Sequence, residues 1–114
     1  MATAQVGTLL RHVQKLASGC RARQWTDRQL LDDFAARHDE SAFAAIVGRH
    51  GAMVLRVCRR VLGHEQDAED AFQATFLVLV RKASTIGRRE LLRNWLYGVA
   101  LRTALETRSV CERR

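Results

Sequence analysis

The chain has 114 residues, which is enough for one domain whose hydrophobic core needs no disulfide or metal to hold it. It contains no proline and no run of alternating β-branched residues, so the composition favours helices and excludes a fold rich in strands. Its net charge is +7, and the distribution of this charge along the chain is more informative than the sum.

The charge falls into three unequal parts. Residues 1–25 carry four basic and no acidic side chains, residues 26–80 have a net charge of −3, and residues 81–114 have one of +6. A basic carboxyl-terminal third attracts the phosphate backbone of nucleic acids, although a basic surface can also serve solubility alone. We therefore expect two kinds of surface, an acidic one in the middle of the chain and a basic one after it.

Other features of the composition argue against several kinds of site. The three cysteines are widely spaced and odd in number, which is typical of free thiols in a reducing compartment such as the cytoplasm. The four histidines lack metal-binding spacing, so we expect neither a metal nor a cofactor. The longest apolar run, Phe76–Val80, is too short to span a membrane, and no secretion signal is recognisable.

Residues 1–25 are predicted to form a short amino-terminal extension. Four apolar residues recur there at helical spacing, namely Leu9, Leu10, Val13 and Leu16. A linker-like stretch follows from Gly19 to Arg23. We expect a partly ordered extension that holds either a docked helix or a frayed one.

The compact domain is predicted to begin at Thr26. Thr26 and Gln29 match a capping box, in which a hydroxyl and an amide side chain satisfy the first amide groups of a helix. This helix should end near Arg37–His38, and Asp39 can then cap the helix that follows.

The second helix is predicted from Glu40 to Leu62. Gly63 is suited to end it, while Gly48 and Gly51 weaken its middle and favour a kink or break near His50. One face is apolar, and the other carries four arginines that serve either solvation or contact with a phosphate or a partner: Arg49, Arg56, Arg59 and Arg60.

The third predicted helix, Asp67–Lys82 with Asp67 as its cap, has two contrasting faces. A wide core stripe holds Ala68, Ala71, Phe72, Thr75, Phe76, Val78 and Leu79. The opposite arc carries Glu69, Asp70, Gln73 and Arg81, with Leu77 at its centre. A large apolar side chain in the middle of a polar face indicates either a docking surface for another protein or a single exposed leucine without a role.

A small basic loop over residues 83–89, with an exposed Ile86, is predicted before a last helix, Glu90–Val110. One face of that helix is expected to enter the core, and it holds Leu92, Trp95, Leu96, Val99, Thr103 and Val110. Tyr97 lies on the opposite face, and Arg102 on a strip between the two. A basic loop beside an aromatic residue and an arginine is typical of a site for unstacked bases.

No catalytic constellation is present. The acidic pairs Asp32–Asp33 and Glu69–Asp70 are better explained by capping or solvation, and no nucleophile motif or phosphate-binding glycine loop occurs. We therefore expect an all-α, compact bundle of about four helices that works as a binding module and not as an enzyme.

Residues 26–114 resemble region 2 of bacterial RNA polymerase sigma factors, within the extracytoplasmic-function group of the sigma-70 family. The resemblance is carried by Leu30-Leu31 with Phe34, Ala42-Phe43, Arg49-His50 with Val54, Cys58–Gly63, Asp67–Gln73, Phe76-Leu77 and Trp95–Ala100. The most specific parts are the Asp67–Leu77 block and the Trp95–Ala100 block at their separation.

The resemblance implies two binding activities. In the first, the Asp67–Lys82 helix docks on the clamp helices of the largest subunit of the polymerase core through Asp70, Gln73 and Leu77, with Glu69 beside them. These residues lie on the arc that periodicity alone places outside the core. Ala74 departs from the family pattern, which often has Glu there, and this could weaken core binding or change its salt dependence.

The second implied activity is recognition of the promoter −10 element as single-stranded, non-template DNA. By resemblance, a pocket for a flipped base is lined by Lys82, Ile86, Tyr97, Val99 and Arg102, and phosphates are held by Arg88, Arg89 and Arg93. Flipping a base costs a few kcal/mol, of which stacking on an aromatic ring can return about 1–3 kcal/mol.

Family members also carry a region 4 helix-turn-helix domain for the −35 element, which has no counterpart before Arg114. The sequence is therefore expected to be either part of a longer factor or a protein with region 2 alone. An anti-sigma factor is a further implied partner. Two alternatives stay open: a small helical interaction protein or decoy that binds a regulator without touching DNA, and a non-specific nucleic-acid binder.

Overall fold

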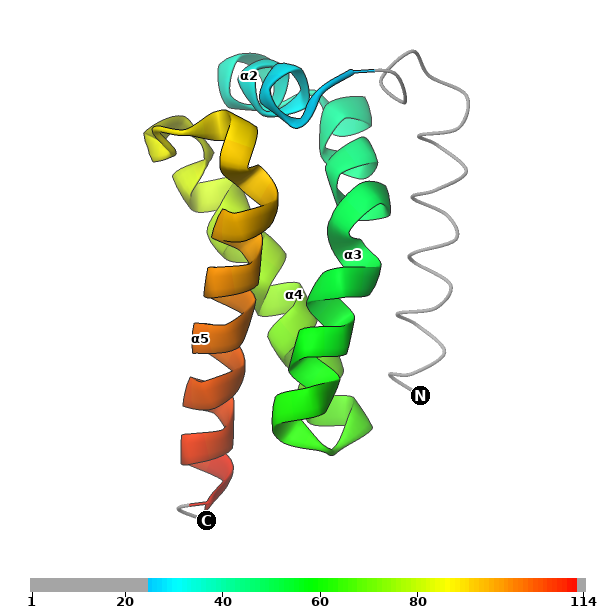
Figure 1. Cartoon of the computed structure of the whole chain (residues 1–114), viewed down its shortest axis with the longest axis vertical. Coiled ribbons are helices and arrows are strands. Elements are labelled where there is room, and N and C mark those ends of the chain that lie inside the picture. The colour runs from blue at the N-terminus through cyan, green and yellow to red at the C-terminus, as the bar shows by residue number, and fades with distance from the viewer. Residues whose placement is uncertain (1–24, 113–114) are drawn as a thin grey trace.

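Residues 25–112, the part of the chain that the computed structural model describes, consist of helices joined by short turns. In chain order they are α2 (Asp27–Arg37), α3 (Glu40–Leu62), α4 (Glu65–Lys82), the 3₁₀ turns η2 (Ala83–Thr85) and η3 (Arg89–Leu91), and α5 (Leu92–Glu112) (Figure 1). The predicted all-α bundle is confirmed. The helical pattern expected within residues 1–24 lies outside the described residues.

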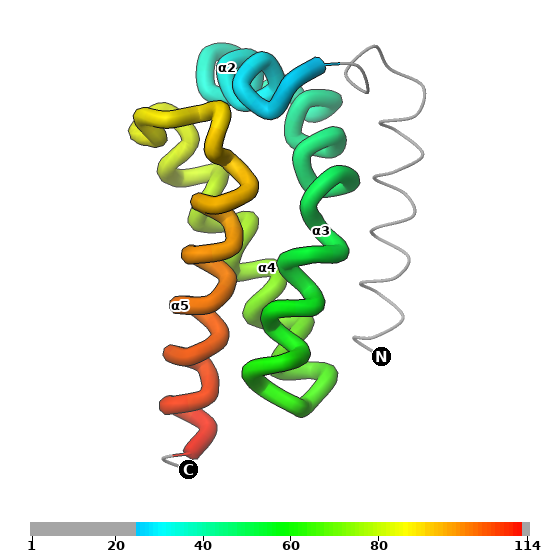
Figure 2. Tube along the Cα trace, viewed as in Figure 1, coloured from blue at the N-terminus to red at the C-terminus, as the bar shows by residue number. Residues whose placement is uncertain are grey.

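The helices form a small bundle with one crossing element. α3, α4 and α5 pack on one another along the long axis of the molecule, and α2 lies across one end of them (Figure 1). The turn between α3 and α4 lies at the opposite end from α2, as the tube in Figure 2 shows. Each helix contributes to one core, whose largest fully buried apolar side chains are Phe72, Leu30, Leu31, Ile46, Leu79, Leu92 and Leu96.

Phenylalanine rings connect α2, α3 and α4. The ring centroids of Phe34 and Phe43 are 5.2 Å apart, those of Phe43 and Phe76 are 6.3 Å apart, and those of Phe76 and Phe72 are 5.2 Å apart. Tilted and edge-on rings at these distances attract one another beyond the gain from burial. The series therefore fixes the end of the bundle where α2 crosses.

The predicted caps of α2 and α3 are confirmed. The Thr26 hydroxyl accepts from the Gln29 amide at 3.2 Å, and the Gln29 side chain accepts from the Thr26 amide at 2.8 Å. α2 stops at His38, whose left-handed backbone (φ 52°) lets its amide donate to the Phe34 carbonyl at 2.7 Å. Asp39 then caps α3 by accepting from the Ser41 amide at 2.9 Å.

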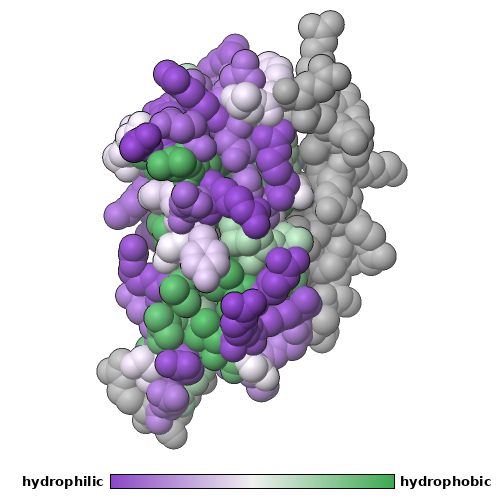
Figure 3. All heavy atoms as spheres, viewed as in Figure 1, coloured by the Kyte–Doolittle hydropathy of each residue, from purple (hydrophilic) through white to green (hydrophobic). Residues whose placement is uncertain are grey.

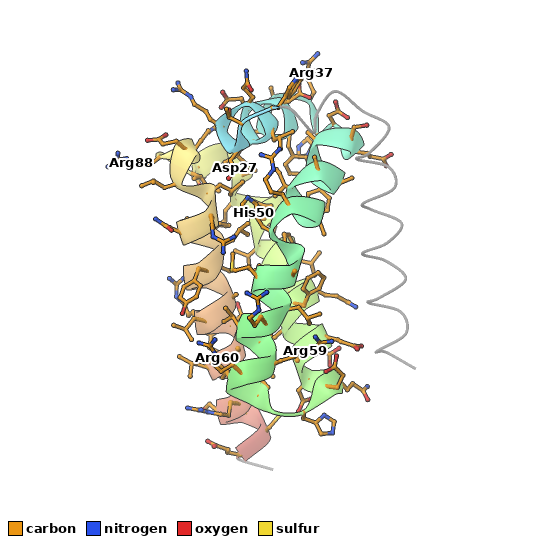
Figure 4. The ribbon with its side chains drawn as sticks, turned by 45° about the vertical axis from the view of Figure 1, so that its right-hand side comes forward. Asp27, Arg37, His50, Arg59, Arg60 and Arg88 are labelled. Carbon is orange, nitrogen blue, oxygen red and sulfur yellow. The ribbon has the colours of Figure 1, made fainter. Side chains whose placement is uncertain are left out.

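A polar anchor ties α2 to α3. His50, 3% exposed, places Nε2 at 3.0 Å from both carboxylate oxygens of Asp27, and Figure 4 shows the two side chains meeting where α2 crosses α3. Arg49 donates to Asp27 at 2.9 Å and to the Trp25 carbonyl at 2.8 Å. Burial raises the pKa of Asp27, but His50 and Arg49 outweigh it and hold that pKa below its ordinary value.

The break expected near His50 is not present, because α3 runs as one helix from Glu40 to Leu62. Packing against α2, α4 and α5 along its length, together with the Asp27 anchor at its middle, outweighs the weak helix propensity of Gly48 and Gly51. Gly63 ends the helix in the left-handed conformation, with φ 64°.

The predicted cap of α4 is wrong. The helix begins at Glu65, and His64 holds the cap position without a side-chain hydrogen bond. Arg59, in the last turn of α3, binds Glu65 with an Nη2–Oε2 distance of 2.8 Å, which draws this residue into the first turn. Asp67 therefore lies inside the helix, where it accepts from the Cys111 thiol of α5 at 3.5 Å.

The end of the bundle also differs from expectation in two places. The basic segment after α4 is not a plain loop, because it contains η2 and η3. Val110, expected in the core, is 48% exposed, because it lies in the last turns of α5. The rest of the predicted core face of α5 is buried or, for Trp95 and Thr103, half-buried. None of the described helices is long and apolar enough to cross a membrane.

Replacing Asp27 with Asn should destabilise the domain by about 1–3 kcal/mol, because His50 and Arg49 lose the carboxylate they share. The folded-state pKa of Asp27 lies below its ordinary value of 3.8, so this contribution is complete above that pH and is lost as the pH falls through the folded-state value. Urea unfolding from pH 7 to pH 3 measures both effects.

The matched control is Asp70→Asn, which neutralises an exposed carboxylate. We expect a change within about 0.5 kcal/mol for this control. Equal stability of the Asp27 and Asp70 variants at pH 7 would contradict the anchoring role of Asp27.

Candidate functional site

The outer face of α4 presents an apolar side chain among polar ones. Leu77 is 59% exposed, and Gln73 and Asp70 lie exposed one and two turns before it, respectively, on the same face. The arrangement follows from the inner face, where Phe72, Phe76 and Leu79 are buried. The structure therefore brings together three of the four residues expected to bind a protein partner.

The fourth residue, Glu69, was expected on this exposed face and is instead fully buried. α4 packs against both α3 and α5, so its buried arc is wider than the apolar stripe of the sequence and includes position 69. The Glu69 side chain interacts with that of Glu65 and is attracted by the Arg59 guanidinium. In this structure Glu69 is not available as a surface contact.

An apolar groove lies beside Leu77, and the sequence pattern did not predict it. Its volume is about 340 Å³, and its lining comes from α3 and α4: Phe43, Val47, Phe72, Gln73, Phe76, Leu77 and Val80. Val80 adds a second exposed apolar side chain, at 37% exposure, one turn along from Leu77. The exposed leucine is thus one wall of a groove and not an isolated residue.

A second group of candidate residues lies on the segment after α4 and on α5. Lys82, Arg88, Arg93 and Arg102 are exposed, and Tyr97 is 45% exposed. Arg93 and Tyr97 are four residues apart on α5 and therefore neighbours on one face. Arg102 lies five residues beyond Tyr97, on a different strip of the helix, as the sequence predicted.

Two residues expected to line a base pocket belong to the core. Ile86 is 7% exposed and Val99 is 6% exposed. Ile86 is buried because α2 packs over η2. The loop therefore directs its apolar residue into the core and does not expose it to solvent. The expectation of an exposed Ile86 is wrong, and direct contact of either side chain with a ligand would require a rearrangement.

The two arginines at the end of this loop are already engaged. Arg89 donates to Asp32 of α2 at 2.7 Å and to the Ile86 carbonyl at 3.3 Å, while Arg88 pairs with Glu90 at 3.3 Å. Figure 4 shows Arg88 at the outer edge of this corner. Arg89 therefore positions the loop, and Asp32 is a supporting residue that the sequence could not indicate across 57 positions.

The groups that could serve chemistry have structural roles. Burial raises the pKa of the Cys58 thiol to about 11, so it stays protonated near neutral pH. Within residues 25–112, no group of three or more His, Cys, Asp and Glu side chains is arranged to hold a metal ion. All four arginines of the stripe on α3 are exposed, and two of them, Arg49 and Arg59, pair with carboxylates within the domain.

Comparison with known proteins identifies the family of the domain. The family model for sigma-70 region 2 matches residues 46–109, which is more than half of the chain and runs from α3 through most of α5. No curated protein and no solved structure matches the chain. The region 2 domain takes part in binding the RNA polymerase core and in recognising the −10 promoter element. The chain belongs to the sigma-70 region 2 family of transcription initiation domains.

Proposed function

We propose that the outer face of α4 docks on the clamp helices of the largest subunit of the RNA polymerase core. The observation that carries the proposal is Leu77, which is 59% exposed between polar neighbours on a helix whose opposite face is fully packed. Burying a leucine side chain contributes about 1.5–3 kcal/mol, which is the scale of a binding hot spot. Asp70 and Gln73 would add polar contacts around it, with Asp70 facing a basic partner.

We propose further that α5 and the loop before it hold the −10 element as a single strand. Tyr97 is the stacking surface, and Lys82, Arg88 and Arg93 contact phosphates. Arg102 donates to a base edge. Ile86 and Val99 are buried, so they support the binding surface from the core and do not contact the base. Arg89 keeps its bond to Asp32 and holds the loop in place.

The binding unit is proposed to begin at Thr26, because α2 packs on α3, η2 and η3 and belongs to the same core. Residues 1–25 are then an extension of that unit. In this view the protein is a non-enzymatic initiation factor of the bacterial cytoplasm. An anti-sigma factor that covers the same surfaces is a further expected partner.

Leu77→Arg should weaken binding to the polymerase core by about 2 kcal/mol or more, roughly 30-fold, because a charge replaces the apolar anchor. Leu105→Arg is the matched control, since it makes the same change at a leucine of α5 that is 41% exposed. Binding of labelled protein to purified core enzyme measures both. Equal affinity of the two variants for the core enzyme would contradict the proposal that α4 docks on it.

Tyr97→Ala should reduce binding of single-stranded −10 oligonucleotides to the polymerase complex by about 1–3 kcal/mol, the contribution of one stacked base. Tyr97→Phe keeps the ring and should retain most of the affinity. Val110→Ala, at another exposed position of α5, is the control.

The same titration separates the alternatives. Salt-sensitive binding with no sequence preference would indicate a non-specific nucleic-acid binder. No binding of any oligonucleotide would favour a helical interaction protein that does not contact DNA.

A further inference from the structure

The arginine stripe of α3 divides into two paired and two unpaired residues. Arg49 forms an ion pair with a carboxylate of α2, and Arg59 with one of α4. Arg56 and Arg60 are also exposed, but neither has an ion-pair partner among residues 25–112. They lie one helical turn apart, where like charges repel and destabilise a helix. An anion bound by both side chains would remove this repulsion.

The paired and unpaired arginines point to different sides of α3. Figure 4 shows Arg60 on the side of α3 that borders α5, and Arg59 on the side of the turn into α4. The ion pair of Arg59 with Glu65, at 2.8 Å, fixes that second direction. Arg56 precedes Arg60 by four residues and therefore lies on the same side of the helix as Arg60. The two unpaired guanidinium groups thus belong to the face that α3 shares with α5.

α5 contributes an exposed apolar strip to this face. Tyr97 is 45% exposed and Leu105 is 41% exposed, and the half-buried Leu101 lies between them at four-residue spacing. Tyr97 and Leu101 each precede a fully buried alanine by three residues, so the strip borders the packed side of α5. Figure 3 shows the face on which α3 and α5 lie in front of α4, where apolar side chains gather among strongly hydrophilic ones. The face therefore combines an aromatic ring, aliphatic side chains and cations.

The distances across this face are short on the scale of a nucleic-acid strand. The axes of two packed helices lie about 8–10 Å apart. The strip from Tyr97 to Leu105 covers eight residues, or about 12 Å along α5. A strand that stacks one base on Tyr97 therefore needs only a few nucleotides to bring its backbone to the arginines of α3.

Phosphate groups suit this face better than the carboxylates of an acidic protein segment. Tyr97 offers the aromatic surface on which bases stack, and residues 81–114, which include it, carry a net charge of +6. Arginine binds phosphate with paired, charge-assisted hydrogen bonds. Arg56 and Arg60 are spaced by about 6 Å along α3, which is close to the separation of neighbouring phosphates in a single strand. The unpaired arginines thus continue the basic surface of α5 onto a second helix.

We propose that Arg56 and Arg60 of α3 bind backbone phosphates of the same DNA strand whose base stacks on Tyr97. The strand then crosses the face formed by α3 and α5, and α3 becomes the second helix of the DNA site. This inference rests on the proposed function, which places a base on α5 but assigns no DNA contact to α3. Arg59 has no part in the contact, because it is paired and faces α4.

The test measures binding of labelled single-stranded oligonucleotides to the full chain alone, so that docking on the polymerase is not required. A short −10 oligonucleotide is compared with versions that are extended by several nucleotides at the 5′ or the 3′ end. At least one extension should tighten binding, and the double variant Arg56→Gln/Arg60→Gln should abolish this gain. The slope of log K against log salt should become shallower by about 1.4, or about 0.7 for each lost phosphate contact. The loss of affinity should therefore grow about 25-fold for each tenfold drop in salt.

Arg59→Gln is the matched control, because it removes the same charge at the position next to Arg60. An equal loss in the control, or a gain from extension that survives the double variant, would overturn the proposal and favour an acidic protein partner for this face. Binding that depends on Arg56 and Arg60 but is unchanged by Tyr97→Ala would support the phosphate contact and contradict the base site of the proposed function. If no oligonucleotide binds, both the phosphate contact and the DNA-binding role of α5 are wrong.

Discussion

The burial of Phe72, Phe76 and Leu79 on the inner face of α4 is the constraint on which the rest of the structure depends. Because these side chains enter the core between α3 and α5, the helix cannot rotate, and Leu77 is held outward. The same packing leaves an apolar groove beside Leu77, and Phe43 and Phe76 are part of its lining. One set of core contacts therefore produces both the exposed anchor and the hollow beside it.

Polar contacts determine how the remaining elements lie on this bundle. Asp27 fixes α2 to α3 through His50 and Arg49, and Asp32 fixes the loop after α4 to α2 through Arg89. α2 thus connects α3, which packs on α4, to the loop that carries the candidate DNA contact.

Local sequence signals predicted most of the helices, because their caps are chemical patterns within four residues, as at Thr26 and Asp39. Prediction failed where distant segments decide the outcome. The ion pair between Asp32 and Arg89 spans 57 positions, and burial of Ile86 depends on α2 closing over the loop. Helical periodicity placed Glu69 on the polar arc of α4. Periodicity describes a single helix, and it does not show how wide a face that helix buries when it packs against two neighbours. The exposure of Leu77 was predictable, because the apolar stripe of α4 is well defined and Leu77 lies on the opposite, polar side of the helix.

The two surfaces have opposite electrostatic character, which fits the charge division along the chain. The first half of α4 is acidic and suits a basic protein partner, while the loop and α5 are basic and suit nucleic acid. The most direct test of the protein contact is photocrosslinking from position 77. A photoreactive residue at position 77 should crosslink to the clamp helices of the largest polymerase subunit, and one at position 105 should not. Crosslinks from position 105 alone, or from neither position in a complex that forms, would contradict the assignment of α4 as the polymerase-docking helix.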